Sequence, residues 1–274
     1  MILTYTRTGN RHVRHRKLCD DVVKAVQYGN FSLLLLCDGC GSSKYSLEAA
    51  HRITNRLADC VSYPERLINV DNSFDTEDFL HYCASPNNEE AFMWLFINEI
   101  RREVKELCAL YQCRQSELCC TLIAVLIEYD PKTSKNSAVV ITIGDGFVAT
   151  YHRKSKLTSL VSRGENRENN PNMTYFCTSA DAINHTKIYR IEDFDALLIS
   201  SDGITHLVDI DSIHELNGFM CKVAESVAQT DTRFTEEMNR LLNSYIEQSP
   251  HLLDLEDDCS VVYYSTDKQA NRRL

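Results

Sequence analysis

The chain has 274 residues, 43% of them hydrophobic and 25% charged, which is ordinary for a soluble enzyme, and we expect residues 1–274 to form one domain. Its 39 acidic and 29 basic residues give a net charge of −10, which argues against nucleic acid as a partner, because phosphate contacts supply most of that affinity. The N-terminus lacks the apolar core of a signal peptide and no stretch reaches the roughly 20 apolar residues of a membrane helix, so we expect a cytoplasmic protein that does not bind membranes. We also expect a monomer.

The first elements that the sequence predicts are a basic segment and a β-hairpin. Residues 7–17 hold a dense cluster of arginine, lysine and histidine. Strand-forming residues follow over 21–27 and 31–37, and the Tyr-Gly-Asn of residues 28–30 is a turn signal between them. The sequence therefore predicts two antiparallel strands.

The hairpin leads into a Gly-rich turn and a helix. Its second strand ends at Asp38, glycines and small residues occupy 39–43, and apolar residues recur at helical spacing over 45–61. Residues 62–86 are polar and acidic, so we expect a connection or an insertion there, without chemistry. A long amphipathic helix is predicted over 88–113 from its acidic first turn and its apolar stripe.

The middle of the chain predicts a second hairpin. Its strands are expected over 120–128 and 138–143, and the residues between them are turn formers. The second strand ends in a Gly-Asp-Gly bend at 144–146, and a further strand is expected over 147–151.

The last third combines a loop, two strands and two helices. Residues 162–185 are Asn-rich and irregular, which indicates an exposed loop that borders the active site. Strands are expected over 196–201 and 260–264, with two helical stretches within 211–247 between them. Residues 268–274 are polar and are expected to fray.

Five aspartates share one feature, since each stands where a strand begins or ends. Carboxylates that converge at the edge of a core need cations to neutralise them, and hard oxygen ligands select Mg²⁺ or Mn²⁺ over Zn²⁺. The sequence therefore predicts a metal site built from carboxylates. The five are Asp21, Asp38, Asp145, Asp202 and Asp257.

The twelve cysteines do not indicate a disulfide framework, because they are scattered through predicted helices and strands of a large chain without an export signal. We expect most of them to be buried, reduced thiols. Cys37 and Cys40 form an isolated C-x-x-C, for which a structural role is favoured over a metal site. Cys119 and Cys120 are adjacent, so their side chains point to opposite faces of a strand and are poor joint ligands.

The motifs, taken in order, resemble those of the metal-dependent serine/threonine protein phosphatases of the 2C type, and the likeness is closest to their compact bacterial branch. No single motif is diagnostic, but six in the same order span almost the whole chain. They are His12 with Cys19-Asp20-Asp21, the run from Cys37 to Ser46, the run from Cys120 to Ala124, Ile143-Gly144-Asp145-Gly146, Ser200-Ser201-Asp202-Gly203, and the run from Asp257 to Val262.

The resemblance implies an α+β fold, a four-layer α/β/β/α sandwich with two central antiparallel sheets. It also implies a hydrolase that removes phosphate from phosphoserine or phosphothreonine in protein substrates, in signalling, by in-line attack of a water or hydroxide that bridges two Mn²⁺ or Mg²⁺ ions. The order of predicted elements agrees with that fold independently.

The resemblance also assigns roles to single residues. It makes Asp38 the carboxylate that bridges the two metals and Gly39 a ligand through its backbone carbonyl. Asp202 and Asp257 become ligands of one metal and, with Asp38, the catalytic carboxylates.

Two further acids take supporting roles in this scheme. Asp21 is expected to hold the site mainly through bound water, and Asp145 corresponds to a position linked to an additional, weaker metal. Asp20 and Asp258 adjoin proposed ligands, and a shift of one residue would exchange their roles with those of their neighbours.

The basic segment before the first strand is expected to supply a phosphate-binding guanidinium. Arginine can bind two phosphate oxygens at once, so Arg14 or Arg16 is favoured over Lys17, and the spacing does not decide between them. A solvated basic edge is the alternative.

The proton donor for the leaving group is left open by the sequence. Cys40 stands where some members of the family carry a histidine with that role, and its nearness to the metal ligands motivates a hypothesis of thiol regulation. A metal-bound water, His12 or His15 could supply the proton instead.

Two alternative functions also follow from the sequence. One is a catalytically silent member that serves as a regulatory binding module. The retention of every carboxylate ligand weighs against this alternative. The other is a phosphatase of a nucleotide or a small phosphate ester, which would use the same metal chemistry.

Overall fold

In the part of the chain that the structure describes, ten strands pair into two five-stranded sheets, and every pair within them is antiparallel. The computed structural model describes residues 1–63, 76–165, 173–229, 234–248 and 255–266. The first sheet has the order β1 (Ile2–Arg7), β10 (Cys259–Ser265), β9 (Ala196–Ser200), β6 (Phe147–His152) and β7 (Leu157–Ser162). The second has the order β2 (Asp21–Tyr28), β3 (Phe31–Asp38), β4 (Leu122–Asp130), β5 (Lys135–Ile143) and β8 (Lys187–Glu192).

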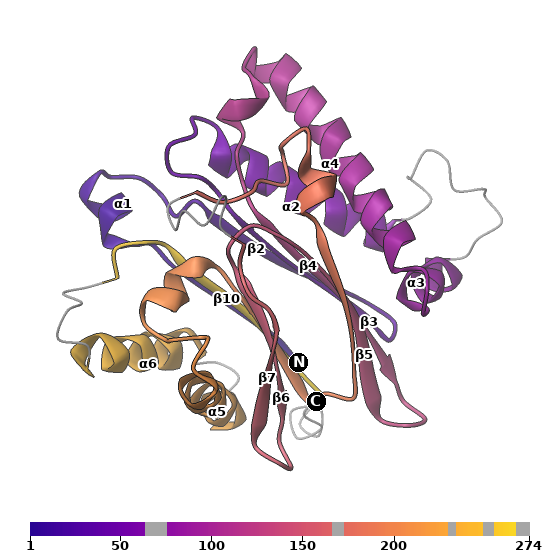
Figure 1. Cartoon of the computed structure of the whole chain (residues 1–274), viewed down its shortest axis with the longest axis vertical. Coiled ribbons are helices and arrows are strands. Elements are labelled where there is room, and N and C mark those ends of the chain that lie inside the picture. Colours follow the sequence, from indigo (N-terminus) through magenta and orange to yellow (C-terminus); the bar gives the residue numbers. More distant parts are fainter. Residues whose placement is uncertain (64–75, 166–172, 230–233, 249–254, 267–274) are drawn as a thin grey trace.

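Helices cover the outer face of each sheet, which gives four layers (Figure 1). Helices α2 (Ser46–Ser62), α3 (Thr76–Ala84) and α4 (Glu89–Tyr111) pack on the sheet that contains β3. Helices α5 (Ile213–Gln229) and α6 (Phe234–Gln248) pack on the sheet that contains β9. The predicted α/β/β/α sandwich is therefore confirmed.

The position of β3 explains its continuous apolar run. Leu33 and Leu35 point into the core under the helices, whereas Leu34 and Leu36 point into the core between the two sheets. All four are fully buried. A strand that is covered on both faces has no polar face, so its sequence does not alternate.

The structure adds elements that the sequence did not predict. Within 62–86, expected to be a connection or an insertion, α3 packs Leu80 and Cys83 into the core; residues 64–75 lie outside the described residues. The added elements are β1, β7, β8 and the five-residue helix α1 (Asn10–Arg14). The tail at 268–274 also lies outside the described residues.

The loop expected over 162–185 agrees only in part with the structure. Its described residues include the 3₁₀ helix η4 (Ala182–His185) and Cys177, which is 2% exposed. The segment is therefore not wholly exposed.

Among the described residues, no helix has the length and apolar character needed to cross a bilayer.

Strand pairing gathers the acid-bearing ends at one end of the sandwich. Asp21, at the start of β2, pairs in register with Asp38, at the end of β3. In the other sheet, Ser200 at the end of β9 pairs with Val261 near the start of β10. The residues after β9 and before β10, which include Asp202 and Asp257, therefore emerge at the same edge.

Candidate metal centre

A cavity of about 520 Å³ lies at this end of the sandwich, and four of the five predicted carboxylates line it. Ligand oxygens of Asp38, Asp145 and Asp202 lie within 4.8 Å of one another. A second group, within the same limit, consists of Asp202, Asp257 and a nitrogen of His206. The two groups share Asp202, so they form one continuous cluster.

The turn that carries Asp38 is bound on both sides by backbone contacts. The Asp38 amide donates to the Thr121 hydroxyl at 3.1 Å, and the Thr121 amide donates to the Asp38 carbonyl at 2.8 Å. The Gly39 amide donates to the Asp20 carbonyl at 3.1 Å, and a Cβ at position 39 would lie 2.9 Å from that oxygen. Glycine is required here because the backbone of the neighbouring strand approaches closely.

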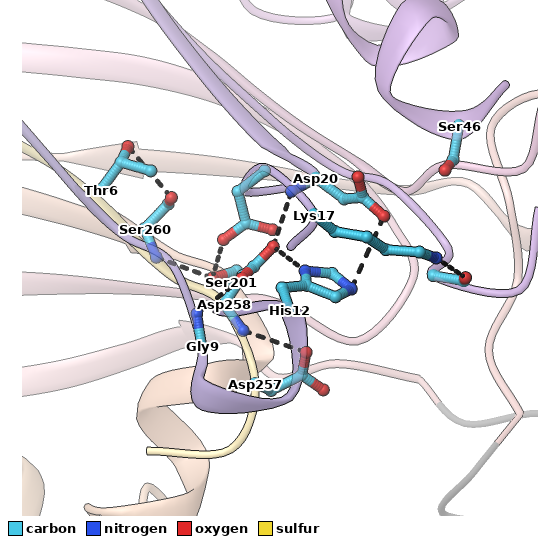
Figure 2. A network of polar contacts seen from close by, with 12 residues as sticks. Thr6, Gly9, His12, Lys17, Asp20, Ser46, Ser201, Asp257, Asp258 and Ser260 are labelled. Carbon is cyan, nitrogen blue, oxygen red and sulfur yellow. Dashed lines mark hydrogen bonds and ion pairs between the residues drawn. The ribbon is translucent and has the colours of Figure 1, made fainter. Parts of the chain in front are cut away.

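Asp258 ties the basic N-terminal segment to the site (Figure 2). Its carboxylate accepts hydrogen bonds from the amides of Gly9, at 2.7 Å, and Asp20, at 2.6 Å, and it contacts Nδ1 of His12 at 2.9 Å. Asp257, next to it, lines the cavity and belongs to the cluster. The geometry thus separates the two adjacent acids: Asp257 faces the cluster and Asp258 organises the surrounding backbone.

Asp21 belongs to neither group among the residues that the structure describes. One of its oxygens accepts a hydrogen bond from the Ser201 hydroxyl at 2.8 Å, and the other, Oδ1, is buried without a hydrogen-bond partner. A buried oxygen without a partner calls for a water or an ion. This position behind the cluster is compatible with the expected contact through water.

The carboxylates raise one another's pKa. Burial, followed by the charges of Asp21 and Asp202, holds the pKa of Asp38 well above its usual range. Burial and then the charge of Asp202 raise the pKa of Asp145 to about 7. Burial also raises the pKa of Asp21 to about 7, and burial and then the charge of Asp257 raise the pKa of Asp202. The site therefore accumulates negative charge that protons alone offset only in part at neutral pH.

The donor set fits a divalent cation. Oxygen ligands dominate both groups, and Mg²⁺ and Mn²⁺ prefer such ligands. A cation would relieve the repulsion that raises these pKa values. The cluster therefore has the donor set of a metal site, with Asp202 common to both groups.

The basic segment contributes to the cavity one histidine that was singled out in the sequence, His12, and an arginine that was not, Arg11. Arg11 and His12 line the cavity, whereas Arg14, Arg16 and His15 are not among the described lining residues. The Arg14 guanidinium forms an exposed ion pair with Glu256. His12 is 5% exposed, and its Nε2 is buried without a hydrogen-bond partner.

His206 and four further lining residues were missed in the sequence. His206 lies one turn after Asp202 in the 3₁₀ helix η5 (Asp202–His206), and this spacing was the available signal. The others come from the start of β4, where Thr121 lies in the Cys120–Ala124 motif but was not proposed as a site residue, and from the segment after residue 172, which carries no motif. They are Thr121, Met173, Thr174 and Phe176.

All twelve cysteines are free thiols. Six are buried and six are partly buried, so burial of most of them is not observed. Cys37 is fully buried, while Cys40 lines the cavity and lies 3.1 Å from the Ser42 hydroxyl. The C-x-x-C therefore does not form a joint site.

A family model described as protein phosphatase 2C matches residues 8–244. The serine/threonine phosphatase Stp1 from Staphylococcus aureus is similar in structure, with a TM-score of 0.60 and 16% identity over 97% of this chain and 94% of that one. The S. agalactiae serine/threonine phosphatase has a TM-score of 0.60 and 14% identity over 97% and 99%.

A third solved structure, RsbX in complex with magnesium, has a TM-score of 0.52 and 12% identity, over 96% of this chain and 92% of that one. At these identities the likeness concerns the fold. No curated protein matches the chain in sequence. The resemblance expected from the sequence motifs is confirmed by the family match and by the structural neighbours.

Proposed function

Since the chain belongs to the protein phosphatase 2C family and is therefore a phosphoprotein phosphatase, we propose that it hydrolyses phosphoserine and phosphothreonine in proteins with two divalent cations, Mn²⁺ or Mg²⁺. The observation that carries this proposal is the pair of ligand groups joined through Asp202 in one cavity. Two groups provide for two ions. A weaker third ion remains part of the proposal, with Asp145 as its ligand.

The residues that would hold the ions are those of the cluster and its border. Asp38, Asp202 and Asp257 supply carboxylates, and Gly39 lies in the same cavity wall, where its carbonyl is the proposed ligand. Asp21 supports the site from behind, through water.

When bound, the cations activate a water for in-line attack on phosphorus and neutralise charge on the phosphoryl oxygens. The chain's own contribution is to fix the carboxylates before substrate arrives. Thr121 holds the Asp38 turn, and Asp258 holds the backbone next to Asp257. His12, which lines the cavity, is the better placed of the two histidines proposed as proton donors, because His15 does not line it. Its Nδ1 contacts Asp258 and its Nε2 lies 3.8 Å from an Asp20 carboxylate oxygen, and Nε2 is the nitrogen that we propose for the transfer.

Arg11 is the guanidinium that we propose to bind the phosphate. It is an exposed arginine that lines the same cavity as the carboxylates, and a guanidinium can bind two phosphate oxygens at once. Arg14 and Arg16, favoured in the sequence, remain candidates only if they move toward the cavity. In Arg11→Ala we expect kcat/KM for a phosphopeptide to fall about 10- to 100-fold, the value of a charge-assisted contact. If kcat/KM instead fell 10- to 100-fold in Arg14→Ala or Arg16→Ala and was unchanged in Arg11→Ala, the phosphate-binding role would belong to Arg14 or Arg16.

We also propose that residues 1–274 act as one domain and as a cytoplasmic monomer in signalling. The support is the family match over 8–244 in one stretch and the net charge of −10, which disfavours nucleic acid. Size-exclusion chromatography with light scattering measures the oligomeric state.

The experiment that tests the function is hydrolysis of phosphoserine and phosphothreonine peptides by metal-stripped protein, with Mn²⁺, Mg²⁺ or neither added. We expect release of phosphate that depends on metal and falls to the metal-free level in Asp38→Asn and Asp202→Asn. Asp59→Asn, an exposed aspartate on α2, is the matched control. No release by folded protein under any metal would indicate a binding module, and release only from nucleotides or small esters would indicate the other alternative.

A further inference from the structure

His206 gives the acidic cluster a nitrogen donor. One of its ring nitrogens lies within 4.8 Å of carboxylate oxygens of both Asp202 and Asp257, and the residue lines the same cavity as Asp38 and Asp145. The second ligand group is therefore a mixed set of two oxygens and one nitrogen, unlike the first group, which has oxygens only.

The local fold sets this arrangement. Asp202 and His206 begin and end η5, and the Thr205 hydroxyl donates to the Asp202 carbonyl at 2.6 Å, which stabilises the turn. Gly203 lies so close to the chain before β10 that a Cβ would be 2.0 Å from the Asp258 carbonyl oxygen. The absence of that Cβ lets η5 lie directly against the segment that carries Asp257.

The His206 ring is also available to a ligand. Within the described part of the chain, neither a hydrogen bond nor an ion pair engages its nitrogens. His12, which lines the same cavity, has its Nδ1 in contact with Asp258 instead, and His185 stacks on Tyr175. An exposed imidazole of this kind can turn toward an ion without breaking another contact.

We propose that His206 is a metal ligand, and that it makes the second ligand group select Mn²⁺ or a similar transition ion over Mg²⁺. This inference rests on the proposed function. Mg²⁺ binds through oxygens and water, whereas imidazole suits transition metals. A neutral nitrogen donor also adds a ligand to this crowded cluster without adding another negative charge.

The test uses the full chain, stripped of metal and then loaded with Mn²⁺ alone. Pulsed electron paramagnetic resonance detects a ¹⁴N nucleus bonded to Mn²⁺. We expect nitrogen coupling in the wild type, its loss in His206→Gln and in His206→Asp, and its retention in His214→Gln, a control histidine on α5. Histidine labelled with ¹⁵N should change the coupling in the wild type and leave the His206→Gln spectrum unaltered.

Metal titration by calorimetry gives the second readout, which does not depend on turnover. We expect the ratio of Mn²⁺ to Mg²⁺ affinity to fall about 10- to 100-fold in His206→Gln, the range that altered ligand surroundings produce. In His206→Asp, Mn²⁺ binding should persist while the preference moves toward Mg²⁺, since the donor set then contains oxygens only.

The outcomes separate this inference from the function on which it rests. Mn²⁺ binding without nitrogen coupling, or coupling that persists in His206→Gln, would overturn the role of His206 and leave the metal-dependent phosphatase intact. Failure of the folded wild type to bind either metal would overturn both.

Discussion

At the scale of single residues, missing Cβ atoms decide how closely the segments around the cluster approach. Gly9 donates its amide to Asp258 at 2.7 Å, and a Cβ at position 9 would lie 2.2 Å from the backbone carbonyl carbon of Asp257. Gly164 has the same relation to Asp145, because its Cβ would lie 2.0 Å from the Asp145 carbonyl oxygen. Backbone, unlike a flexible side chain, cannot yield cheaply to such a contact. These glycines therefore fix the backbone that carries two of the acids.

Replacement of Gly9 by alanine tests this close approach. We expect Gly9→Ala to lower the free energy of unfolding by about 1–3 kcal/mol, the usual cost of overpacking, and to weaken Mn²⁺ binding because Asp257 is displaced. The matched control is Gly218→Ala in helix α5, where a Cβ meets nothing within 4 Å. That change should stabilise the protein by about 0.5–1 kcal/mol, since glycine weakens a helix interior. Urea unfolding and Mn²⁺ titration measure both variants, and stabilisation of both would show that the close contact at Gly9 is not present in solution.

At the scale of elements, α2 and α4 are joined by ion pairs as well as by apolar contacts. The Glu99 carboxylate on α4 forms ion pairs with Nε of Arg56, on α2, at 2.6 Å and with Nη1 of Arg102, on its own helix, at 3.1 Å. Glu99 is 3% exposed, whereas the side chains of Arg56 and Arg102 are 31% and 35% exposed. Only the carboxylate is cut off from water, so the two sides of this contact are not equivalent.

This difference in exposure predicts that removing the two arginines destabilises the fold more than removing the buried carboxylate. Glu99→Met leaves two arginines that can reach solvent, and an apolar side chain fills the buried space. We therefore expect the free energy of unfolding to fall by only about 0–2 kcal/mol. The double variant Arg56→Ala with Arg102→Ala leaves a buried carboxylate without its cations, and we expect the free energy of unfolding to fall by about 3–5 kcal/mol. Both are read from urea unfolding, with Mn²⁺ affinity as the control that should not change. A larger loss in Glu99→Met would mean that the arginines, not the carboxylate, bear the cost of desolvation.

Strands in the interior of the sheets were predictable from sequence, whereas of the four edge strands only β2 was predicted. The strands β3, β4, β5 and β9 are buried runs that the pattern of apolar residues marks clearly. The three missed strands, β1, β7 and β8, all lie at sheet edges, where many of their side chains meet solvent and no apolar run develops. The helix α1 spans five residues, which is too short to show a period.

The site likewise contains residues that the sequence pattern predicts and residues that it does not. Asp38, Asp145, Asp202 and Asp257 were predictable because each adjoins a strong strand or a glycine bend, and they do converge on one cavity. His206 follows Asp202 by four residues within the five-residue η5, a spacing that the sequence shows but that is too short to form a periodic pattern. The choice between arginines in the basic segment depends on how that segment folds back on Asp258, which spacing alone does not encode.

At the scale of the whole molecule, the cluster couples stability to pH and to metal. In the metal-free protein the pKa values of Asp145 and Asp21 are about 7, and those of Asp38 and Asp202 are also raised. Between the ordinary aspartate pKa near 4 and about 7, the folded chain therefore binds more protons than the unfolded chain. The free energy of unfolding must then fall as pH rises through this window. Divalent cations act in the opposite sense, because they bind the deprotonated carboxylates.

We therefore predict that protons stabilise the cluster at low pH and that divalent cations stabilise it at high pH. We expect chelated protein to melt at a higher temperature at pH 5.5 than at pH 8, and Mn²⁺ to raise the melting temperature at pH 8 and far less at pH 5.5. One pKa unit corresponds to about 1.4 kcal/mol, and each kcal/mol shifts the melting temperature by about 2–4 °C for a chain near this size, so the difference should be several degrees. Scanning calorimetry with and without chelator measures it.

The variant Asp38→Asn distinguishes the cluster from the general acidity of the molecule. A net charge of −10 also favours lower pH through repulsion between surface groups, and this contribution is unchanged by one substitution far from most of them. Asp38 lies among the other acids, and burial together with their charges raises its pKa. Its removal should therefore stabilise the chelated protein at pH 8, flatten its pH dependence and abolish the stabilisation by Mn²⁺. If chelated Asp38→Asn kept the full pH dependence of the wild type, surface charge and not the cluster would govern it.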